Sequence, residues 1–245
     1  MLNKDNFSVI IPARYKSSRL PFKILELIHG FPMIYWTYYR ACLANIGDVI
    51  VAADDHNVFK ILEKYKIPFI ETSSKCKNGT ERIAEVSNKL SGLNFFINIQ
   101  CDEPLLNPQT IRDVYNNGIL DFGFKTAVSE IPYGGNVNEV KVAISMNSRI
   151  RFASRTAIPF CNDGSNKYFK IHGVYSYSKK TLDSYISNEP GPIESLESVE
   201  QLRCIEYDIP LFSVKTAHSE RSVDTIEDLN YIRSKPVSDF EEWLN

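Results

Sequence analysis

Four basic side chains follow the first apolar segment of the chain, in the stretch IIPARYKSSRLPFK, and no acidic residue lies among them. The four are Arg14, Lys16, Arg19 and Lys23. Arginine presents a planar fork and lysine a point charge to phosphate oxygens, so this pattern favours a phosphate ligand. The stretch contains neither a P-loop nor a G-x-G-x-x-G motif, and a solvated basic loop is the alternative interpretation.

Carboxylates form a second candidate group. Asp102 and Glu103 end the apolar segment INIQCDEP, and Asp224 precedes a helix-like pattern in RSVDTIEDL. Mg²⁺ is a hard cation that takes one or two carboxylates together with substrate phosphate oxygens, so these positions suit it. Two structural interpretations stay open, because Asp-Glu-Pro favours a turn and Asp224 or Thr225 can cap a helix.

Two further polar patterns lie on predicted helices. The segment KNGTERIAE (77–85) begins a helix, and helix starts suit anions or a polar nucleobase edge, although a plain capped helix fits equally well. In IESLESVEQLR, acidic and basic side chains recur every three residues, at Glu194, Glu197, Glu200 and Arg203. A salt-bridged helix surface is the default interpretation of such a stripe.

The elements that must position these residues alternate through the first half of the chain. We expect strands at 7–13, 48–53, 67–71 and 94–100, with helices at 32–44, 56–65 and 80–90. This order predicts an α/β fold with an open, mainly parallel, doubly wound sheet, whose ligands bind at the carboxyl ends of the strands.

The second half is less regular and predicts a smaller mixed antiparallel lobe. We expect strands at 124–131, 139–146, 167–178 and 211–217, with helices at 193–207 and 225–234. Without a repeat or a clear linker, residues 1–245 are interpreted as one domain, in which residues 125–190 form a substrate-side lobe.

Composition narrows the class of protein. A net charge of −2 and a pI near 6.1 argue against bulk binding of nucleic acid or of an anionic membrane surface. The five cysteines have no C-x-x-C spacing and the four histidines no ligand spacing, which disfavours a disulfide framework and a zinc site. With no signal-like segment and no apolar run of membrane-spanning length, we expect a soluble cytoplasmic protein.

Six sequence blocks together resemble the 3-deoxy-manno-octulosonate (Kdo) cytidylyltransferases. IIPARYKSSRLPFK is similar to the family's IIPARY-x-S-[ST]-R-[LF]-P-G-K, NGTERIAEV to SGTERLAEV, and NIQCDEP to N-[VL]-Q-G-D-E-P. SRTAIPF is similar to SRA-x-IP-[WY], PGPIESLESVEQLR to P-x-P-LE-x-x-E-x-LEQLR, and VDTIEDL to VDTPEDL. The blocks occur in family order between residues 7 and 233, so the resemblance covers most of the chain.

The resemblance implies a nucleotide-diphospho-sugar transferase-like fold and a Mg²⁺-dependent reaction. CTP and a 3-deoxy ulosonic acid, such as Kdo or its 8-amino form, would give a CMP-sugar and pyrophosphate for lipopolysaccharide or capsule. The anomeric hydroxyl would attack the α-phosphorus in line, so the protein mainly positions groups and neutralises charge. The family also implies a homodimer built through the lobe of residues 125–190.

The resemblance assigns roles to individual residues by motif. The phosphates of CTP would meet Arg14, Arg19 and Lys23, and the cytidine would face Gly79, Thr80 and Arg82. The sugar acid would contact Gln100, Arg155, Tyr175, Glu200 and Gln201. Mg²⁺ would be held by Asp102 and Asp224, which with Lys23 form the catalytic group, whereas Lys16 falls at a variable position.

The chain departs from the family pattern at several positions. Phe22, Cys101 and Ser222 each stand where the family has glycine, and a positive φ at Phe22 would be strained. The family's H-x-G-[IV]-Y has its histidine where this chain has Ile171, and His172 lies one place further on. On a strand His172 should face the side opposite to Ile171, which points to a modified acceptor sugar or a reshaped site.

Other functions stay open from the sequence. The acceptor could be a nonulosonate, or the chain could be a paralogue that binds nucleotide sugars without catalysis, which the altered glycines would favour. A glycosyltransferase would use Asp102 and Glu103 as an acidic metal motif, but it leaves the basic loop unexplained. An oxidoreductase is disfavoured because no G-x-G-x-x-G motif is present.

Overall fold

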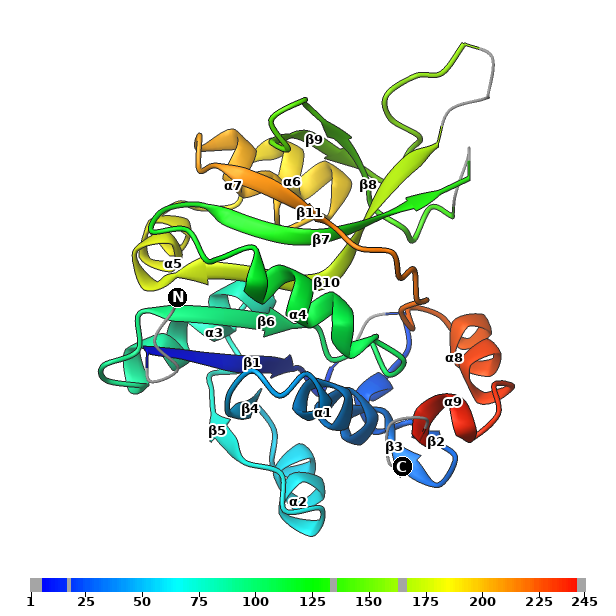
Figure 1. Cartoon of the computed structure of the whole chain (residues 1–245). Helices are drawn as coiled ribbons and strands as arrows, with labels where there is room; N and C mark the ends of the chain where they lie inside the picture. Colours follow the sequence, from blue (N-terminus) through cyan, green and yellow to red (C-terminus); the bar gives the residue numbers. More distant parts are fainter. Residues whose placement is uncertain (1–5, 17–18, 133–135, 163–166, 242–245) are drawn as a thin grey trace.

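The computed structural model describes residues 6–16, 19–132, 136–162 and 167–241 of the chain. In these ranges one nine-stranded sheet has the main order β11-β7-β10-β6-β1-β4-β5, with β8 attached to β10 and β9 to β8 (Figure 1). The strands are β1 (Phe7–Ala13), β4 (Val49–Ala53), β5 (Phe69–Glu71), β6 (Phe95–Ile99), β7 (Phe124–Ile131), β8 (Lys141–Ile144), β9 (Ile150–Ser154), β10 (Tyr168–Ser178) and β11 (Leu211–Lys215).

The sheet has a parallel half and a half that contains antiparallel pairs. β6, β1, β4 and β5 are parallel neighbours, whereas β10 runs antiparallel to both β6 and β7. β8 and β9 extend the antiparallel half, and β11 is parallel to β7. The predicted mainly parallel sheet with a smaller antiparallel part is confirmed, and both parts are joined through β10.

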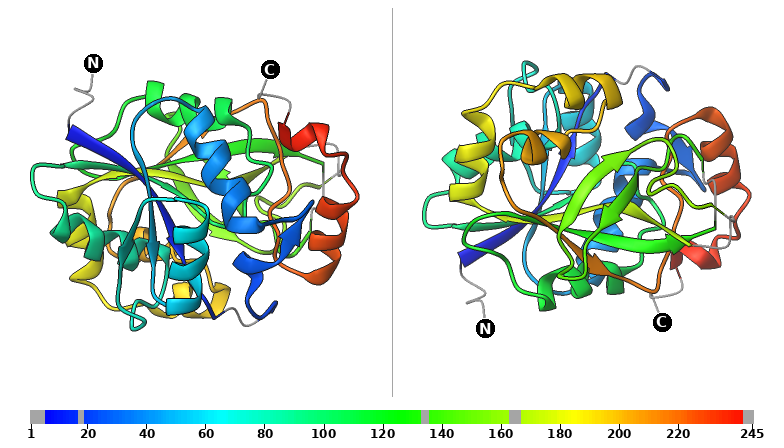
Figure 2. Two further views of the ribbon diagram at one scale, coloured as in Figure 1. Left: turned by 90° about the horizontal axis from the view of Figure 1, so that it is seen from below. Right: turned by 90° about the horizontal axis from the view of Figure 1, so that it is seen from above.

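Helices cover both faces of the sheet, as a doubly wound fold requires. Val9 and Ile11 of β1 pack in one core cluster with α1 and α4, whereas Ile10 packs in another with α3 and α5 (Figure 2). This alternation follows from the period of two in a strand, and the fully buried, mostly apolar β1 is typical of a central parallel strand. The helices are α1 (Met33–Leu43), α2 (His56–Lys64), α3 (Gly79–Lys89), α4 (Pro108–Asn116), α5 (Lys179–Ile186), α6 (Pro192–Glu197), α7 (Leu202–Glu206), α8 (Ile226–Arg233) and α9 (Ser238–Glu241).

Short polar side chains start several of these helices. Asp55 caps α2, Asn78 caps α3 and Asn107 caps α4, each by accepting a backbone N–H in the first turn. Thr225 and Asp228 form a capping box at α8. Asp224 and Thr225 were the two predicted caps of this helix. Thr225 forms the cap, and Asp224 makes other contacts.

The predicted helix at 193–207 is wrong in its middle. The chain forms α6 and α7 instead, and Ser198 ends α6 with a left-handed φ of 53°. Arg203 Nε lies 2.7 Å from Glu194 Oε2, so a buried ion pair joins the two short helices. The predicted salt-bridged helix surface is therefore partly buried, because the break between α6 and α7 allows Arg203 to contact Glu194.

Several elements were not predicted at all. These are α4, α5, α9, β9, a short 3-10 helix (Lys23–Leu25) and a small hairpin of β2 (Leu27–Ile28) and β3 (Phe31–Pro32). The predicted strand at 139–146 shortens to β8. Within the described residues, no helix is both long enough and apolar enough to cross a membrane.

Candidate active site

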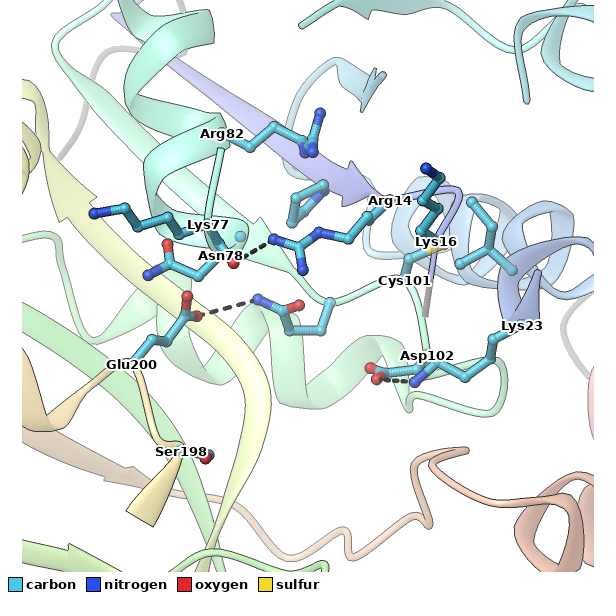
Figure 3. A pocket seen from close by; sticks show the side chains of 14 residues that line it. Arg14, Lys16, Lys23, Lys77, Asn78, Arg82, Cys101, Asp102, Ser198 and Glu200 are labelled. Carbon is cyan, nitrogen blue, oxygen red and sulfur yellow. Dashed lines mark hydrogen bonds and ion pairs between the residues drawn. The ribbon is translucent and has the colours of Figure 1, made fainter. Parts of the chain in front are cut away.

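A cavity of about 390 Å³ opens at the carboxyl ends of β1 and β6, beside the start of α3 (Figure 3). We call it the cation-lined pocket, because five basic side chains border it: Arg14, Lys16, Lys23, Lys77 and Arg82. Ligands of open parallel sheets bind at these strand ends, and clustered cations suit phosphates. The predicted phosphate loop therefore lies at the position where the fold favours ligand binding.

A charge cluster of Arg19, Lys23, Asp102 and Asp224 lies at the edge of this pocket. Lys23 Nζ lies 2.7 Å from Asp102 Oδ2 and 3.5 Å from Asp224 Oδ1, and it donates to the carbonyl of Val223 at 2.8 Å. Arg19 Nη2 lies 2.7 Å from Asp224 Oδ1. Three segments far apart in the sequence thus bring the predicted catalytic residues together.

The two carboxylates of the cluster influence each other. Burial raises the pKa of Asp224 above its ordinary value, and the charge of Asp102 raises it further. Burial lowers the pKa of Lys23, but the charges of Asp102 and Asp224 outweigh it and hold this pKa above its ordinary value. A pair of close carboxylates is stabilised by a cation placed between them.

The cluster offers a limited set of donors for a metal ion. Over the described part of the chain, no group of three or more His, Cys, Asp or Glu side chains is arranged to hold one. Asp102 and Asp224 provide two hard oxygen donors beside a pocket suited to phosphates. The pair fits Mg²⁺ shared with phosphate oxygens and water, because Mg²⁺ accepts so few protein ligands.

The start of α3 forms another wall of the cation-lined pocket. A Cβ atom on Gly79 would lie 2.7 Å from Gln100 Nε2, so the close approach of α3 to the end of β6 favours glycine. Asn78 and Gly79 border the pocket. Thr80 is buried, and its N–H donates to Glu200 Oε2 at 3.3 Å. Of the predicted cytidine-facing residues, Gly79 thus faces the pocket and Thr80 supports it from behind.

Arg14 and Arg82 are placed differently. Arg14 is exposed, and its Nη2 donates to the carbonyls of Cys76 and Lys77. Figure 3 shows the contact with Lys77. Arg82 is buried, and its Nη2 lies 2.7 Å from Asp54 Oδ2. Because Asp54 neutralises this guanidinium, Arg82 mainly joins α3 to the end of β4, whereas Arg14 is accessible to a ligand.

A second cavity, of about 150 Å³, lies between β10 and the segment that leads to α8, and we call it the second pocket. Gln100 and Asp102 border both cavities. The N–H of Gly173 donates to Glu103 Oε1 at 3.0 Å, and its carbonyl accepts from the Gln100 N–H at 2.7 Å. A Cβ on Gly173 would lie 2.7 Å from Gln100 Cβ, so this contact requires glycine.

Two basic side chains, Arg155 and Lys170, border the second pocket. The Arg155 guanidinium donates to backbone carbonyls, of which Glu197 at 2.9 Å is the nearest. Lys170 is buried, and its Nζ lies 3.1 Å from Glu139 Oε1 and 2.9 Å from the carbonyl of Glu220. Arg155 therefore ties segments of the pocket wall together, and Lys170 supplies a buried ammonium.

Ile171 and His172 both border the second pocket, but burial alternates between them along β10. Ile171 is half-buried against the core, and His172 is buried with its Nε2 2.8 Å from Ser129 Oγ. This alternation agrees with the predicted opposite orientation of the two side chains. Burial, and then the charge of Lys170, lower the pKa of His172 to about 3, so the imidazole is neutral.

The other predicted sugar-contacting residues do not all lie together. Tyr175 borders the second pocket with Gln100 and Arg155, whereas Glu200 borders the cation-lined pocket. Gln201 is buried and, within the described residues, contributes to the lining of neither pocket. Its Nε2 lies 3.1 Å from Glu200 Oε1, and burial raises the pKa of that carboxyl to about 7.

Sequence reasoning missed several lining residues, and four of them are charged or polar side chains that bear on ligand binding. Lys77 borders the cation-lined pocket, and Asn138, Glu139 and Lys170 border the second pocket. One signal was available for Lys170, because it occupies a buried-face position in a predicted strand, where an unpaired lysine is rare. The other positions lie in loops whose approach to the pockets only the tertiary fold determines.

The family departures have visible structural results. Phe22 adopts the left-handed φ of 59° that the family glycine implies, and its ring packs at a tilt of 36° against Tyr15, with 4.6 Å between the ring centroids. Such a φ is costly for an aromatic residue, as predicted. Cys101 is buried, which raises the pKa of its thiol, and Ser222 borders the second pocket.

A phosphate-suited pocket, a carboxylate pair and an adjoining second pocket on a doubly wound sheet define a nucleotidyltransferase-type protein. The protein-family model described as cytidylyltransferase matches residues 8–213. Two curated relatives are 3-deoxy-manno-octulosonate cytidylyltransferases. The one from Fusobacterium nucleatum is 36% identical over 94% of this chain and 98% of its own, and the one from Lawsonia intracellularis is 35% identical over 91% of each.

A solved structure gives the same result. The chain resembles a CMP:2-keto-3-deoxy-manno-octonic acid synthetase complexed with CTP, with a TM-score of 0.84, 30% identity and coverage of 94% of this chain and 97% of the other. A 4-diphosphocytidyl-2C-methyl-D-erythritol synthase from Anaerococcus prevotii, 14% identical with a TM-score of 0.65, shares the fold. The chain belongs to the 3-deoxy-manno-octulosonate cytidylyltransferase family.

Proposed function

We propose that the protein transfers CMP from CTP to the anomeric hydroxyl of a 3-deoxy ulosonic acid, Kdo or a modified Kdo, and releases pyrophosphate. One observation carries the proposal: the cation-lined pocket and the second pocket share Gln100 and Asp102. A triphosphate in one and a sugar acid in the other would meet beside the carboxylate pair. In this arrangement an acceptor hydroxyl lies near the α-phosphorus, and catalysis follows from positioning and charge neutralisation.

On the donor side, Arg14, Arg19 and Lys23 bind the triphosphate and stabilise the leaving pyrophosphate. Arg14 is exposed beside the start of α3, and Lys23 enters the pocket from its opposite edge. Arg19 reaches Asp224 and also donates to Asn138 Oδ1 at 3.1 Å. Guanidinium and ammonium groups at these places neutralise the charge that develops on the leaving phosphates.

Asp102 and Asp224 would hold Mg²⁺, which the fit of the donor set supports. Bound there, the metal would polarise a phosphate oxygen and lower the pKa of a bound hydroxyl. Asp102 lies in the wall shared by both pockets, so it orients the donor and the acceptor together. Asp224 stands before α8, and the Thr225 capping box fixes its backbone.

On the acceptor side, Gln100, Arg155 and Tyr175 contact the sugar acid, and Lys170 pairs with its carboxylate. Lys170 is a buried ammonium in the second pocket, and a charge-assisted contact there is stronger than in water. The ion pair with Glu139 fixes the position of the Lys170 ammonium. Glu200 and Gln201 lie on the side of the nucleotide, near the start of α3.

The lobe of residues 125–190 is proposed to bind the acceptor and to form a homodimer. Its outer surface exposes Met146 and Phe160, the latter at 83% relative exposure. Exposed large apolar side chains on one lobe favour an interface. Light scattering should give twice the mass of the chain, and Phe160→Asp should reduce that mass to one chain without loss of fold.

The reaction also fits a place in the cell. A CTP-dependent enzyme needs the cytoplasmic nucleotide pool, so we propose a cytoplasmic location. Its CMP-sugar product is a glycosyl donor, and a glycosyltransferase of lipopolysaccharide or capsule assembly would consume it.

The proposal is tested by pyrophosphate release from CTP with Mg²⁺ and a panel of ulosonic acids. Release with Kdo or an amino-substituted octulosonate, and none without an acid, is expected. Release with nonulosonates alone would replace the proposed acceptor, and Ile171 in the second pocket is the observation that favours including them. No release with any acid, together with CTP binding in calorimetry, would show a non-catalytic binding protein.

A further inference from the structure

Lys23 occupies the space between two carboxylates that the proposed function assigns to a metal. Its Nζ is 2.7 Å from Asp102 Oδ2 and 3.5 Å from Asp224 Oδ1. Its side chain is 12% exposed and the two carboxylates are 25% and 14% exposed, so water screens these contacts weakly. A third contact, to the carbonyl of Val223 at 2.8 Å, fixes the ammonium at this point.

An ammonium and a divalent cation compete for the same oxygens at this site. A metal would need the lone pairs of Asp102 and Asp224 that face Lys23, and two cations at one carboxylate pair repel each other. Arg19 adds a second positive charge on Asp224 Oδ1, at 2.7 Å. The protein alone therefore presents a carboxylate pair that is already neutralised.

A triphosphate changes this balance. Lys23 borders the cation-lined pocket as well as the carboxylate pair, so its flexible side chain reaches both. Phosphate oxygens offer the ammonium other partners, and they also supply the ligands that a Mg²⁺ ion lacks on two carboxylates. One incoming ligand thus removes the competitor and completes the metal's coordination.

We propose that Lys23 is an exchangeable cation that holds Asp102 and Asp224 together and sets the order of binding, so that divalent metal enters with the nucleotide. The inference rests on the proposed function, since it takes the metal site from there. In this proposal, Lys23 first positions the two carboxylates that would hold the metal, and it becomes a phosphate ligand when the nucleotide binds. Its loss weakens nucleotide binding but strengthens binding of metal alone, which a purely structural role would not do.

The test measures Mn²⁺ binding without nucleotide, by the loss of the free-ion electron paramagnetic resonance signal. Wild-type protein should bind Mn²⁺ weakly, and Lys23→Met should bind it roughly tenfold to a hundredfold more tightly, since removing one charged contact has about this weight. Lys16→Met removes a charge from the same loop, but Lys16 makes no ion pair among the described residues, so it should resemble wild type.

Two further variants locate the effect and control for folding. Lys23→Arg keeps a cation between the carboxylates and should keep Mn²⁺ binding weak, and Lys23→Met combined with Asp102→Asn should lose the gain. A thermal unfolding transition checks that each variant folds. If the Lys23→Met protein does not fold, Lys23→Gln takes its place. Equal Mn²⁺ affinity of wild type and folded Lys23→Met or Lys23→Gln would overturn the inference.

A second arm with CTP separates this inference from the proposed function. Protein and CTP together should retain more Mn²⁺ than the same concentration of CTP alone, and Asp102→Asn should remove the excess. If wild-type protein with CTP retained no more Mn²⁺ than CTP alone, the proposed metal site itself would be contradicted. An excess in wild type without a gain in Lys23→Met would leave the proposed function standing and refute the exchange alone.

Discussion

The two pockets of this protein are built in different ways. The cation-lined pocket lies at the carboxyl ends of the parallel strands β1 and β6, and most of its wall consists of short motifs near those strands, with Ser198 and Glu200 added from the segment between α6 and α7. The second pocket is assembled from the antiparallel strand β10, the loop before β8 and the segment before α8. The first is fixed mainly by local sequence and the general geometry of parallel sheets, whereas the second depends mainly on long-range contacts. Under the proposed function, the donor side therefore follows from the general fold, whereas the acceptor side depends on how the second half of the chain packs.

The residue that joins both pockets should give the largest effect. Asp102→Asn keeps the shape of the side chain and removes the charge that would hold Mg²⁺, so kcat should fall about a thousandfold or more. Steady-state pyrophosphate release measures this, with circular dichroism to check the fold. Asp183→Asn, which removes an exposed carboxylate on α5, should stay within about twofold of wild type. Near-normal turnover of Asp102→Asn would refute the metal role.

Lys170 tests whether the second pocket binds the acceptor. Lys170→Met should raise KM for the ulosonic acid roughly tenfold or more and leave KM for CTP unchanged, because one buried charge-assisted contact is lost. Lys167→Met is the matched control, since Lys167 is exposed and pairs only with the exposed Glu130 among described residues. An equal rise of both KM values would show that the two pockets are not separate in function.

Glycines in the two pockets allow a direct comparison. A Cβ on Gly173 would meet Gln100 Cβ at 2.7 Å and Glu103 Oε1 at 3.0 Å, whereas one on Gly79 would first meet the movable end of Gln100. Gly173→Ala should therefore lower the free energy of unfolding by about 1–3 kcal/mol, and Gly79→Ala by less. Denaturant unfolding measures both. The opposite order would show that the second pocket is the more adaptable one.

His172 affects stability only at low pH. Its pKa in the folded protein is about 3 against an ordinary value of 6.5, so between these values the unfolded chain binds more protons. Stability is therefore fully present above this window and decreases as the pH falls through it, by at most about 1.4 kcal/mol per pH unit. His172→Gln should reduce the slope of unfolding free energy against pH in that window. An unchanged slope would show that His172 is protonated in the folded protein.

The same contrast explains how much the sequence predicts. The strands around the cation-lined pocket follow from apolar runs, and Arg14, Lys23 and Gly79 lie where their motifs suggested. Arg82 borders the pocket as its motif suggested, but its partner Asp54 comes from another strand end that no local pattern connects to it. This tertiary ion pair could not be predicted from the local motif.

Prediction was also poorer for residues that reach either pocket from the second half of the chain, for the same physical reason. Periodicity favoured one helix at 193–207, but the left-handed Ser198 and the ion pair of Glu194 with Arg203 divide it. This break moves Glu200 to the start of α3, on the nucleotide side. The pairing of Lys170 with Glu139 joins a strand to a loop, and such contacts are set by the packing of the whole sheet.

The central claim is that the α-phosphorus of CTP is transferred to a sugar acid held in the second pocket. Phosphorus-31 nuclear magnetic resonance of the protein with CTP, Mg²⁺ and Kdo observes which bond breaks. The account predicts that the three CTP resonances give way to one phosphodiester resonance of a CMP-sugar and one of pyrophosphate, in equal amounts. Formation of CDP and phosphate, release of free CMP without a phosphodiester, or unchanged CTP with every ulosonic acid would contradict it.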